Sequence, residues 1–301
     1  MSLNSAHEGY DYQDLITSYF ILEEILNGNR ESIFSIDKKH TTGDTPDRFD
    51  DLVITNGDKV QRKQVKYSNE QTSVRLTKDY LSADSYYKIA LHKLYESWKA
   101  LSTIHTEFRL CLAWDEPVES KILKVLNLQP SSLSSFDSFP TKVFKIDINQ
   151  LWEVEPENFN RWDSLKQYVK ENNIDRDDFR KFCECLLIEV NLPKASLKFE
   201  SPHELEKILI SQATRLGIGQ YPNDDINTID FLVRLVKHVG SYRTNSAVVT
   251  TLDVLKDLRI KTDFGKLQQK FEIDQSKNVK SDCRYSSFYN FAVNSKKVIL
   301  S

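Results

Sequence analysis

The sequence contains few cysteines and no long apolar run. Its four cysteines fit neither a zinc site nor a CxxC motif in their spacing: Cys111, Cys183, Cys185 and Cys283. We therefore expect reduced thiols and no structural disulfide. A run of about 18 apolar residues, which a membrane-spanning helix requires, is missing. The first residues also lack the basic-then-apolar order of a signal peptide, so the sequence predicts a cytoplasmic protein with no membrane contact.

Positive charge is also scarce over the chain as a whole. The formal net charge of −3 excludes a uniformly basic nucleic-acid-binding protein. Residues 59–99 are an exception, because they hold nine basic and four acidic residues, a local excess of +5. A surface of this charge suits a phosphodiester substrate, although a solvated helix face gives the same pattern. The length of 301 residues predicts two domains.

A β-hairpin is predicted for residues 48–67. Asp50 and Asp51 precede a short apolar run that is typical of a buried strand. Asn56-Gly57 is a strong two-residue turn signal, and a second β-rich run follows it. Folding at this turn brings the acidic end of the first strand beside the end of the second.

The second strand of this hairpin ends in an amide and an ammonium group. Gln64 and Lys66 point the same way, because side chains alternate along a strand. An Asp carboxylate and a Gln carbonyl are oxygen ligands for a hard divalent cation, and a nearby Lys can orient water or offset phosphate charge. Spacing alone favours an ordinary charged surface hairpin, because acidic turn residues and a lysine on a strand are common.

The remaining elements of the first half predict an α/β fold around a mixed sheet. Helical spacing of apolar residues indicates a buried helix over 8–28, with Gln13 in its first turn and Gly28 as its stop. Further helices are expected over 78–102 and 121–128. Strands are expected over three segments, of which the second is nearly all apolar and central in the sheet: 32–37, 108–114 and 141–147.

After about residue 151 the sequence predicts only helices. Amphipathic patterns mark five segments: 159–172, 175–190, 201–216, 227–238 and 246–258. None of these segments carries a group of residues of catalytic type. We therefore expect the candidate chemistry in the first half of the chain.

Three short motifs in order give the first half a family resemblance. Residues 9–13 at the start of the first helix, 49–54 and 64–68 resemble the PD-(D/E)XK restriction-endonuclease-like nucleases. The resemblance is to the double-stranded DNA endonuclease domain of bacterial antiviral effectors, of the CBASS-associated type or fused to STAND NTPases in AVAST systems. It implies a nuclease domain over 1–152 and an all-helical linker or regulatory domain over 153–292.

The resemblance also implies roles for individual residues. Asp51, Gln64 and Lys66 match the catalytic positions, and Gln13 matches the polar residue of the first helix. The implied ligands of Mg²⁺, or Mn²⁺, are Asp51, Gln64, Gln13 and Asp50. Asp50 remains an alternative to Asp51 as the main ligand, and Gln64 in place of Glu removes one negative charge.

A second Q-x-K motif, residues 61–63, lies in the opposite strand register. The resemblance favours Gln64 and Lys66 because an aromatic and a small polar residue follow that lysine, as Tyr67 and Ser68 do.

The function implied is cleavage of double-stranded DNA with little sequence specificity, as the effector of an anti-phage defence protein. The basic residues expected to bind DNA are Lys63, Arg75, Lys78 and Lys88. Because both strands must be cut, a homo-oligomer is expected. Residues 293–301 resemble the strand before the phosphate loop of a STAND NTPase, although the chain contains no G-x-x-x-x-G-K-[ST] motif. A fused or associated NTPase or sensor module is thus an expected partner, and a simple terminal strand is the alternative.

Two other functional classes stay open at this point. A catalytically decayed nuclease fold would bind nucleic acid without cutting it, and Gln64 is the residue that favours this reading. A scaffold without nuclease ancestry would bind protein partners through its helical half. Dependence on Mg²⁺ separates the nuclease from both alternatives.

Overall fold

The computed structural model describes most of the first 216 residues and a few later ones. The described ranges are 3–29, 31–41, 47–68, 74–82, 89–136, 139–153, 161–197, 202–216, 229–230, 232–234, 236–237, 248–251 and 254. The helices are α1 (Leu3–Leu26), α2 (Lys78–Leu81), α3 (Leu91–Leu101), α4 (Ser120–Leu123), η1 (Ser131–Leu133), α5 (Ile148–Glu153), α6 (Arg161–Glu171), α7 (Arg176–Cys185) and α8 (Glu204–Arg215). The strands are β1 (Ile33–Ile36), β2 (Leu52–Asn56), β3 (Lys59–Tyr67), β4 (Thr106–Ala113), β5 (Leu126–Leu128), β6 (Lys142–Ile146), β7 (Leu186–Val190) and β8 (Val248–Thr250).

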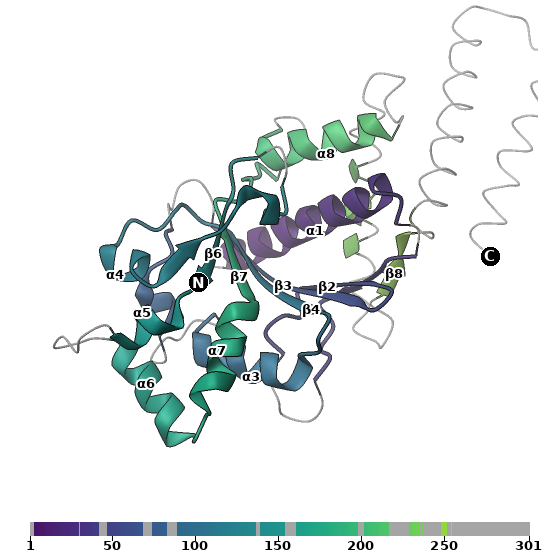
Figure 1. Ribbon diagram of the computed structural model, residues 1–301. Helices are drawn as coiled ribbons and strands as arrows, with labels where there is room; N and C mark the ends of the chain where they lie inside the picture. Colours follow the sequence, from purple (N-terminus) through teal and green to yellow (C-terminus); the bar gives the residue numbers. More distant parts are fainter. Residues whose placement is uncertain are drawn as a thin grey trace, which may run out of the picture.

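The strands form one mixed sheet in the order β5-β6-β7-β4-β3-β2-β1-β8. β3, β4 and β7 are parallel, and the strands on either side of them are antiparallel. Helices α1 and α8 lie on one face of the sheet, and α3, α6 and α7 lie on the other (Figure 1). The predicted α/β class, with a mixed sheet flanked by helices, is confirmed.

The sheet separates two apolar cores because side chains alternate along its strands. On β4, Cys111 and Ala113 face α1, whereas Phe108, Leu110 and Leu112 face α3 and α7. Six consecutive residues at the end of β4 are buried, as expected for the central strand of the sheet. The strands predicted over 32–37 and 141–147 correspond to β1 and β6, and are also confirmed.

The predicted hairpin forms, with its turn one residue later than expected. Asn56 pairs with Lys59, so the two loop residues are Gly57 and Asp58. Gly57 has a φ of 57°, the left-handed conformation that a type II′ turn requires at its first loop position. The hairpin therefore uses the glycine of the turn signal, but at a different position.

The first helix begins earlier than predicted. α1 starts at Leu3 and stops before Gly28, whose φ of 79° ends the helical path. Gln13 consequently lies in the middle of α1 and not in its first turn. It is 7% exposed, so it does not face water as a first-turn residue would.

The expectation of an all-helical second half is wrong at two strands. The helix predicted over 175–190 ends at Cys185, and Leu186–Val190 forms β7 between β4 and β6. All five residues of β7 are buried, so the strand shows no alternation in sequence and its pattern merges with that of the preceding helix. The segment Val248–Thr250 pairs with β1 as β8, where the start of a helix was expected.

Two other predicted helices are shorter than their sequence patterns. The helix expected over 78–102 is interrupted after α2, because Ser82 and Ala90 have extended ψ angles of 161° and 133°. The helix expected over 121–128 ends early, and its second half is the edge strand β5. Helices α6 and α8 agree with prediction. The terminal strand predicted over 293–301 lies outside the described residues.

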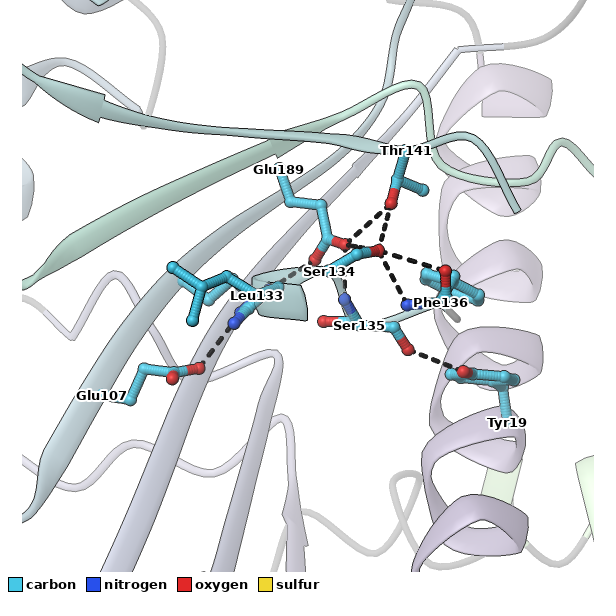
Figure 2. Close-up of polar contacts among 9 residues, drawn as sticks. Tyr19, Glu107, Leu133, Ser134, Ser135, Phe136, Thr141 and Glu189 are labelled. Atoms are coloured by element: carbon cyan, nitrogen blue, oxygen red, sulfur yellow. Dashed lines mark hydrogen bonds and ion pairs between the residues drawn. The ribbon is translucent and has the colours of Figure 1, made fainter. Parts of the chain in front are cut away.

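A buried ionic network fastens the chain on the α1 face of the sheet (Figure 2). Glu189 of β7 is fully buried and accepts bonds from Arg109 Nη1 at 2.8 Å and from the backbone amide of Ser135 at 2.7 Å. The hydroxyls of Ser134 and Thr141 also donate to Glu189, at 3.0 and 3.2 Å. Burial raises the pKa of Glu189, but Arg109 and the other donors outweigh it, and the net shift is downward.

We expect Glu189→Gln to lower the free energy of unfolding at pH 7 by about 3–5 kcal/mol, because it leaves Arg109 with too little countercharge in the interior. Urea denaturation measures this. Glu116→Gln is the control, since the Glu116–Lys142 pair is about 40% exposed at both side chains and removing it should cost about 1 kcal/mol or less. Similar losses of unfolding free energy in Glu189→Gln and Glu116→Gln would contradict the stabilising role of the buried Glu189–Arg109 pair.

Wild type and Glu189→Gln should also differ in how their stability depends on pH. A carboxyl group with a lowered folded pKa stabilises the fold fully above its unfolded value, here 4.5, and loses this effect as the pH falls through the folded pKa. The stability difference between wild type and Glu189→Gln should thus be constant near neutrality and shrink below about pH 4.5. A difference that grows on acidification would refute the role of an ionised Glu189.

Candidate active site

The candidate site is centred on the carboxylate of Asp51, directly before β2. Because Leu52 pairs with Lys63, the next position along the hairpin places Asp51 beside Gln64. The Oδ2 atom of Asp51 accepts bonds from Gln64 Nε2 and from the Val65 backbone amide, the latter at 2.7 Å. Lys66 Nζ lies 3.4 Å from the same oxygen. The structure therefore brings together the three residues predicted to be catalytic.

Lys66 remains accessible within this group. Its Nζ also donates to the Val65 carbonyl oxygen at 2.8 Å, and its side chain is 27% exposed, against 14% for Asp51. Gln64, in contrast, is buried, with 2% exposed. The Lys66 ammonium and the Asp51 carboxylate are thus accessible to a substrate from solvent. The buried Gln64 amide holds the Asp51 carboxylate by a hydrogen bond.

The structure places the lysines of the two Q-x-K motifs on opposite faces of the sheet. Lys63 faces α1, where its Nζ lies 4.3 Å from the centre of the Phe20 ring and its side chain is 2% exposed. Burial is the largest influence on Lys63 and lowers its pKa. Gln64 and Lys66 point to the other face and reach Asp51. The alternation of β3 turns Lys63 into the core, so its side chain does not present the basic surface that the predicted DNA contact requires.

Gln13 reaches the site from α1 and contacts it indirectly. Its Nε2 donates to Asp37 Oδ1 at 2.7 Å and to the backbone oxygen of Asp51 at 3.3 Å. Asp37 directly follows β1, has a φ of 48°, and donates its amide to the same Asp51 oxygen at 3.3 Å. Gln13 thus orients the backbone of Asp51 and the side chain of Asp37.

Asp37 is a further member of this site, and its sequence context did not predict it. The only signal was its position at the end of the alternating segment over 32–37, since strand ends often carry site residues. Nothing in the sequence showed that the end of β1 would lie next to Asp51. That neighbourhood results from the pairing of β1 with β2.

Asp50 adds negative charge next to Asp51. Burial, followed by the charges of Asp51 and Asp47, raises the pKa of Asp50 to about 6. Asp51 is the residue that contacts Gln64 and Lys66, so the structure favours Asp51 over Asp50 as the main candidate ligand.

The oxygen atoms around Asp51 fit Mg²⁺ better than a metal that needs a complete protein cage. In the part of the chain that the structure describes, no three His, Cys, Asp or Glu side chains are grouped to hold a metal. Mg²⁺ keeps several waters and commonly uses one or two carboxylates together with substrate phosphate. Asp51 Oδ1 accepts no hydrogen bond from the described residues and is available for such an ion.

The other residues predicted to bind DNA differ in their exposure to solvent. Arg75 is at the surface with 44% of its side chain exposed, and it donates to the Glu116 carbonyl oxygen at 3.2 Å. Lys78 is 7% exposed at the start of α2, so little of its side chain is available for the predicted DNA contact. Lys88 lies outside the described residues.

Comparison with known proteins adds no family assignment. No protein-family model matches the chain, and no curated protein matches it in sequence. Among the described helices, none combines the length and apolar character needed to cross a membrane. Cys111, Cys183 and Cys185 are free thiols, and Cys283 falls outside the described ranges.

Replacing Gln64 by Glu tests whether the oxygens around Asp51 hold a metal. Without metal, a second buried carboxylate next to Asp51 should lower the stability by about 1–3 kcal/mol, because a donor becomes a repelling acceptor. Adding Mn²⁺ or Mg²⁺ should then raise Tm more in Gln64→Glu than in wild type.

Differential scanning fluorimetry with and without metal measures both effects. The control is Gln150→Glu on α5, which is exposed and should change neither value. An equal response to metal in wild type, Gln64→Glu and the control would contradict a metal site at Asp51.

Proposed function

We propose that this protein is a metal-dependent endonuclease that hydrolyses phosphodiester bonds of double-stranded DNA. The observation that carries the proposal is the contact of one carboxylate, Asp51, with both Gln64 and Lys66 across two adjacent strands. The resemblance of these motifs to PD-(D/E)XK nucleases gives the same assignment of roles. An effector role in bacterial anti-phage defence and a restriction-endonuclease-like fold are parts of the proposal.

Each residue of the site has a proposed role that follows from its chemistry. Asp51, Gln64 and the nearby Asp50 would hold the ion, while Gln13 keeps the backbone of Asp51 in place. A bound Mg²⁺ or Mn²⁺ supplies Lewis-acid polarisation of the phosphate and acidifies a bound water. Lys66, 3.4 Å from Asp51, is placed to orient the attacking water and to offset charge on the phosphate.

A homo-oligomer and a fused or associated STAND NTPase or sensor module remain proposed partners. Cutting both strands requires two sites, and one chain offers a single group of this type in its described part. The exposed Arg75 is the predicted DNA contact that lies at the surface.

A second candidate function is a nucleic-acid-binding module on a decayed nuclease fold. The neutral Gln64 favours it, because a Glu at this position would contribute another negative ligand. This alternative keeps DNA binding but requires neither metal nor Lys66.

Plasmid cleavage with Mg²⁺ or Mn²⁺ tests the proposal. Wild type should convert supercoiled plasmid to open and linear forms, and chelation by EDTA should stop it. Asp51→Asn and Lys66→Ala should each reduce the rate by about 10²–10⁴-fold, because each removes a group that acts on the reacting atoms. Lys59→Ala, in the exposed start of β3, is the matched control and should cleave at the wild-type rate.

Folding of each variant is checked by circular dichroism, so that lost activity is not confused with lost structure. Forced dimerisation by a fused dimeric tag covers the need for two sites. Folded wild type that is silent in both forms, or active Asp51→Asn and Lys66→Ala variants, would refute the nuclease assignment.

A further inference from the structure

Arg62 lies on the same side of β3 as the candidate site but has no assigned role. It precedes Gln64 by two residues, so Arg62, Gln64 and Lys66 point to one face of the sheet. Its pairing partners, Val53 on β2 and Phe108 on β4, are both apolar. The guanidinium therefore continues the row of polar groups that begins at Lys66.

The nitrogen atoms of this guanidinium are poorly satisfied. Nε and Nη1 of Arg62 are buried and have no hydrogen-bond partner among the residues that the structure describes. Nε2 of His40, in the segment between β1 and β2, is in the same situation. Buried donors without acceptors are unfavourable, and such groups often mark the position of an absent ion or ligand.

Asp47 is the acidic residue whose charge acts on Arg62, and both of its oxygens accept backbone amides. Its Oδ2 accepts the His40 amide at 2.9 Å, and its Oδ1 accepts the Phe49 amide at 3.1 Å. Arg62 and Asp47 influence each other electrostatically, yet no ion pair joins them within the described residues. Asp47 thus holds the segment that carries His40 without satisfying the fork of Arg62.

The charge of Arg62 also acts on His40. The pKa of His40 is lowered first by burial and then by the positive charge of Arg62. An imidazole N–H and a guanidinium fork together are donors that suit a phosphate oxyanion.

We infer that Arg62 and His40 form a phosphate-binding subsite beside Asp51, which takes a backbone phosphate of the bound DNA about two nucleotides from the one that is cut. This inference rests on the proposed function, since it assigns DNA as the source of the phosphate. Residues two apart on a strand are separated by about 7 Å, which matches the rise of about two nucleotides of one DNA strand. The subsite therefore holds the strand in register and takes no part in the chemical step.

Binding of a short fluorescent DNA duplex in EDTA tests the inference without any cleavage. Fluorescence anisotropy is measured for wild type, Arg62→Gln and the matched control Lys59→Gln between about 50 and 200 mM salt. Arg62→Gln should weaken binding by about tenfold, because a charge-assisted pair of bonds is lost. The slope of log K against log salt should also fall in magnitude by about one. Lys59→Gln should keep the wild-type affinity.

Two further variants keep the test independent of folding. Arg62→Lys retains the charge but not the fork and should bind with intermediate affinity. His40→Gln should weaken binding less than Arg62→Gln does. Equal binding by wild type, Arg62→Gln and Arg62→Lys would overturn the inference.

Inorganic phosphate separates the possible sources of the oxyanion. At constant ionic strength, phosphate should raise the Tm of wild type relative to chloride and leave that of Arg62→Gln unchanged. Stabilisation by phosphate with no effect of Arg62→Gln on duplex binding would overturn DNA as the source. No stabilisation by phosphate, together with a higher Tm of Arg62→Met, would identify Arg62 as an unsatisfied core residue and refute the subsite.

The two proposals fail separately. Wild type that binds duplex through Arg62 but never cuts plasmid supports the subsite and removes the nuclease activity. Wild type that cuts plasmid while Arg62→Gln binds duplex normally removes the subsite and leaves the nuclease assignment intact.

Discussion

The pairing register of β2 with β3 is the constraint on which the candidate site depends. Leu52 lies opposite Lys63, so Asp51 lies beside Gln64 and within reach of Lys66. A slip of one residue would turn Lys63 toward Asp51 and move Gln64 and Lys66 into the core. The same register places Arg62 in the row of groups that face the candidate substrate.

Contacts on the opposite face of the sheet hold this register in place. Lys63 packs on Phe20 of α1, and the rings of Tyr12 and Tyr67 stack with their centres 4.4 Å apart. Tyr12 also donates to the Pro193 carbonyl oxygen at 2.8 Å. Because these contacts fix α1 across β3, they bring Gln13 to the backbone of Asp51. The apolar core on the α1 face of the sheet thus positions Asp51, Gln64 and Lys66 on the opposite face.

Local signals predicted the parts of the fold that are determined locally. The hairpin followed from a turn glycine between two β-rich runs, and α1 followed from apolar residues at helical spacing. The proximity of Asp51, Gln64 and Lys66 was predictable because alternation along β3 and antiparallel pairing are nearly fixed once a hairpin is assumed. A single glycine, Gly57, set the turn within one residue of its true position.

Properties that arise from long-range packing were not predictable. β7 is buried on both faces, so its sequence carries no period that separates it from α7. The burial of Lys63 and Lys78 depends on which helix covers which face, and a count of basic residues contains no such information. The same holds for Asp37 and Arg62, whose neighbours come from other strands and from the segment before β2.

The central claim is that Asp51 and Gln64 hold a divalent ion next to Lys66. A crystal grown with Mn²⁺ and a DNA duplex, and measured at the manganese absorption edge, locates that ion directly. The account predicts an anomalous peak bound to Asp51 Oδ1, with a duplex phosphate on the same ion and Lys66 alongside. A Mn²⁺ peak at a different group of residues, or a bound duplex with no metal at Asp51, would contradict it.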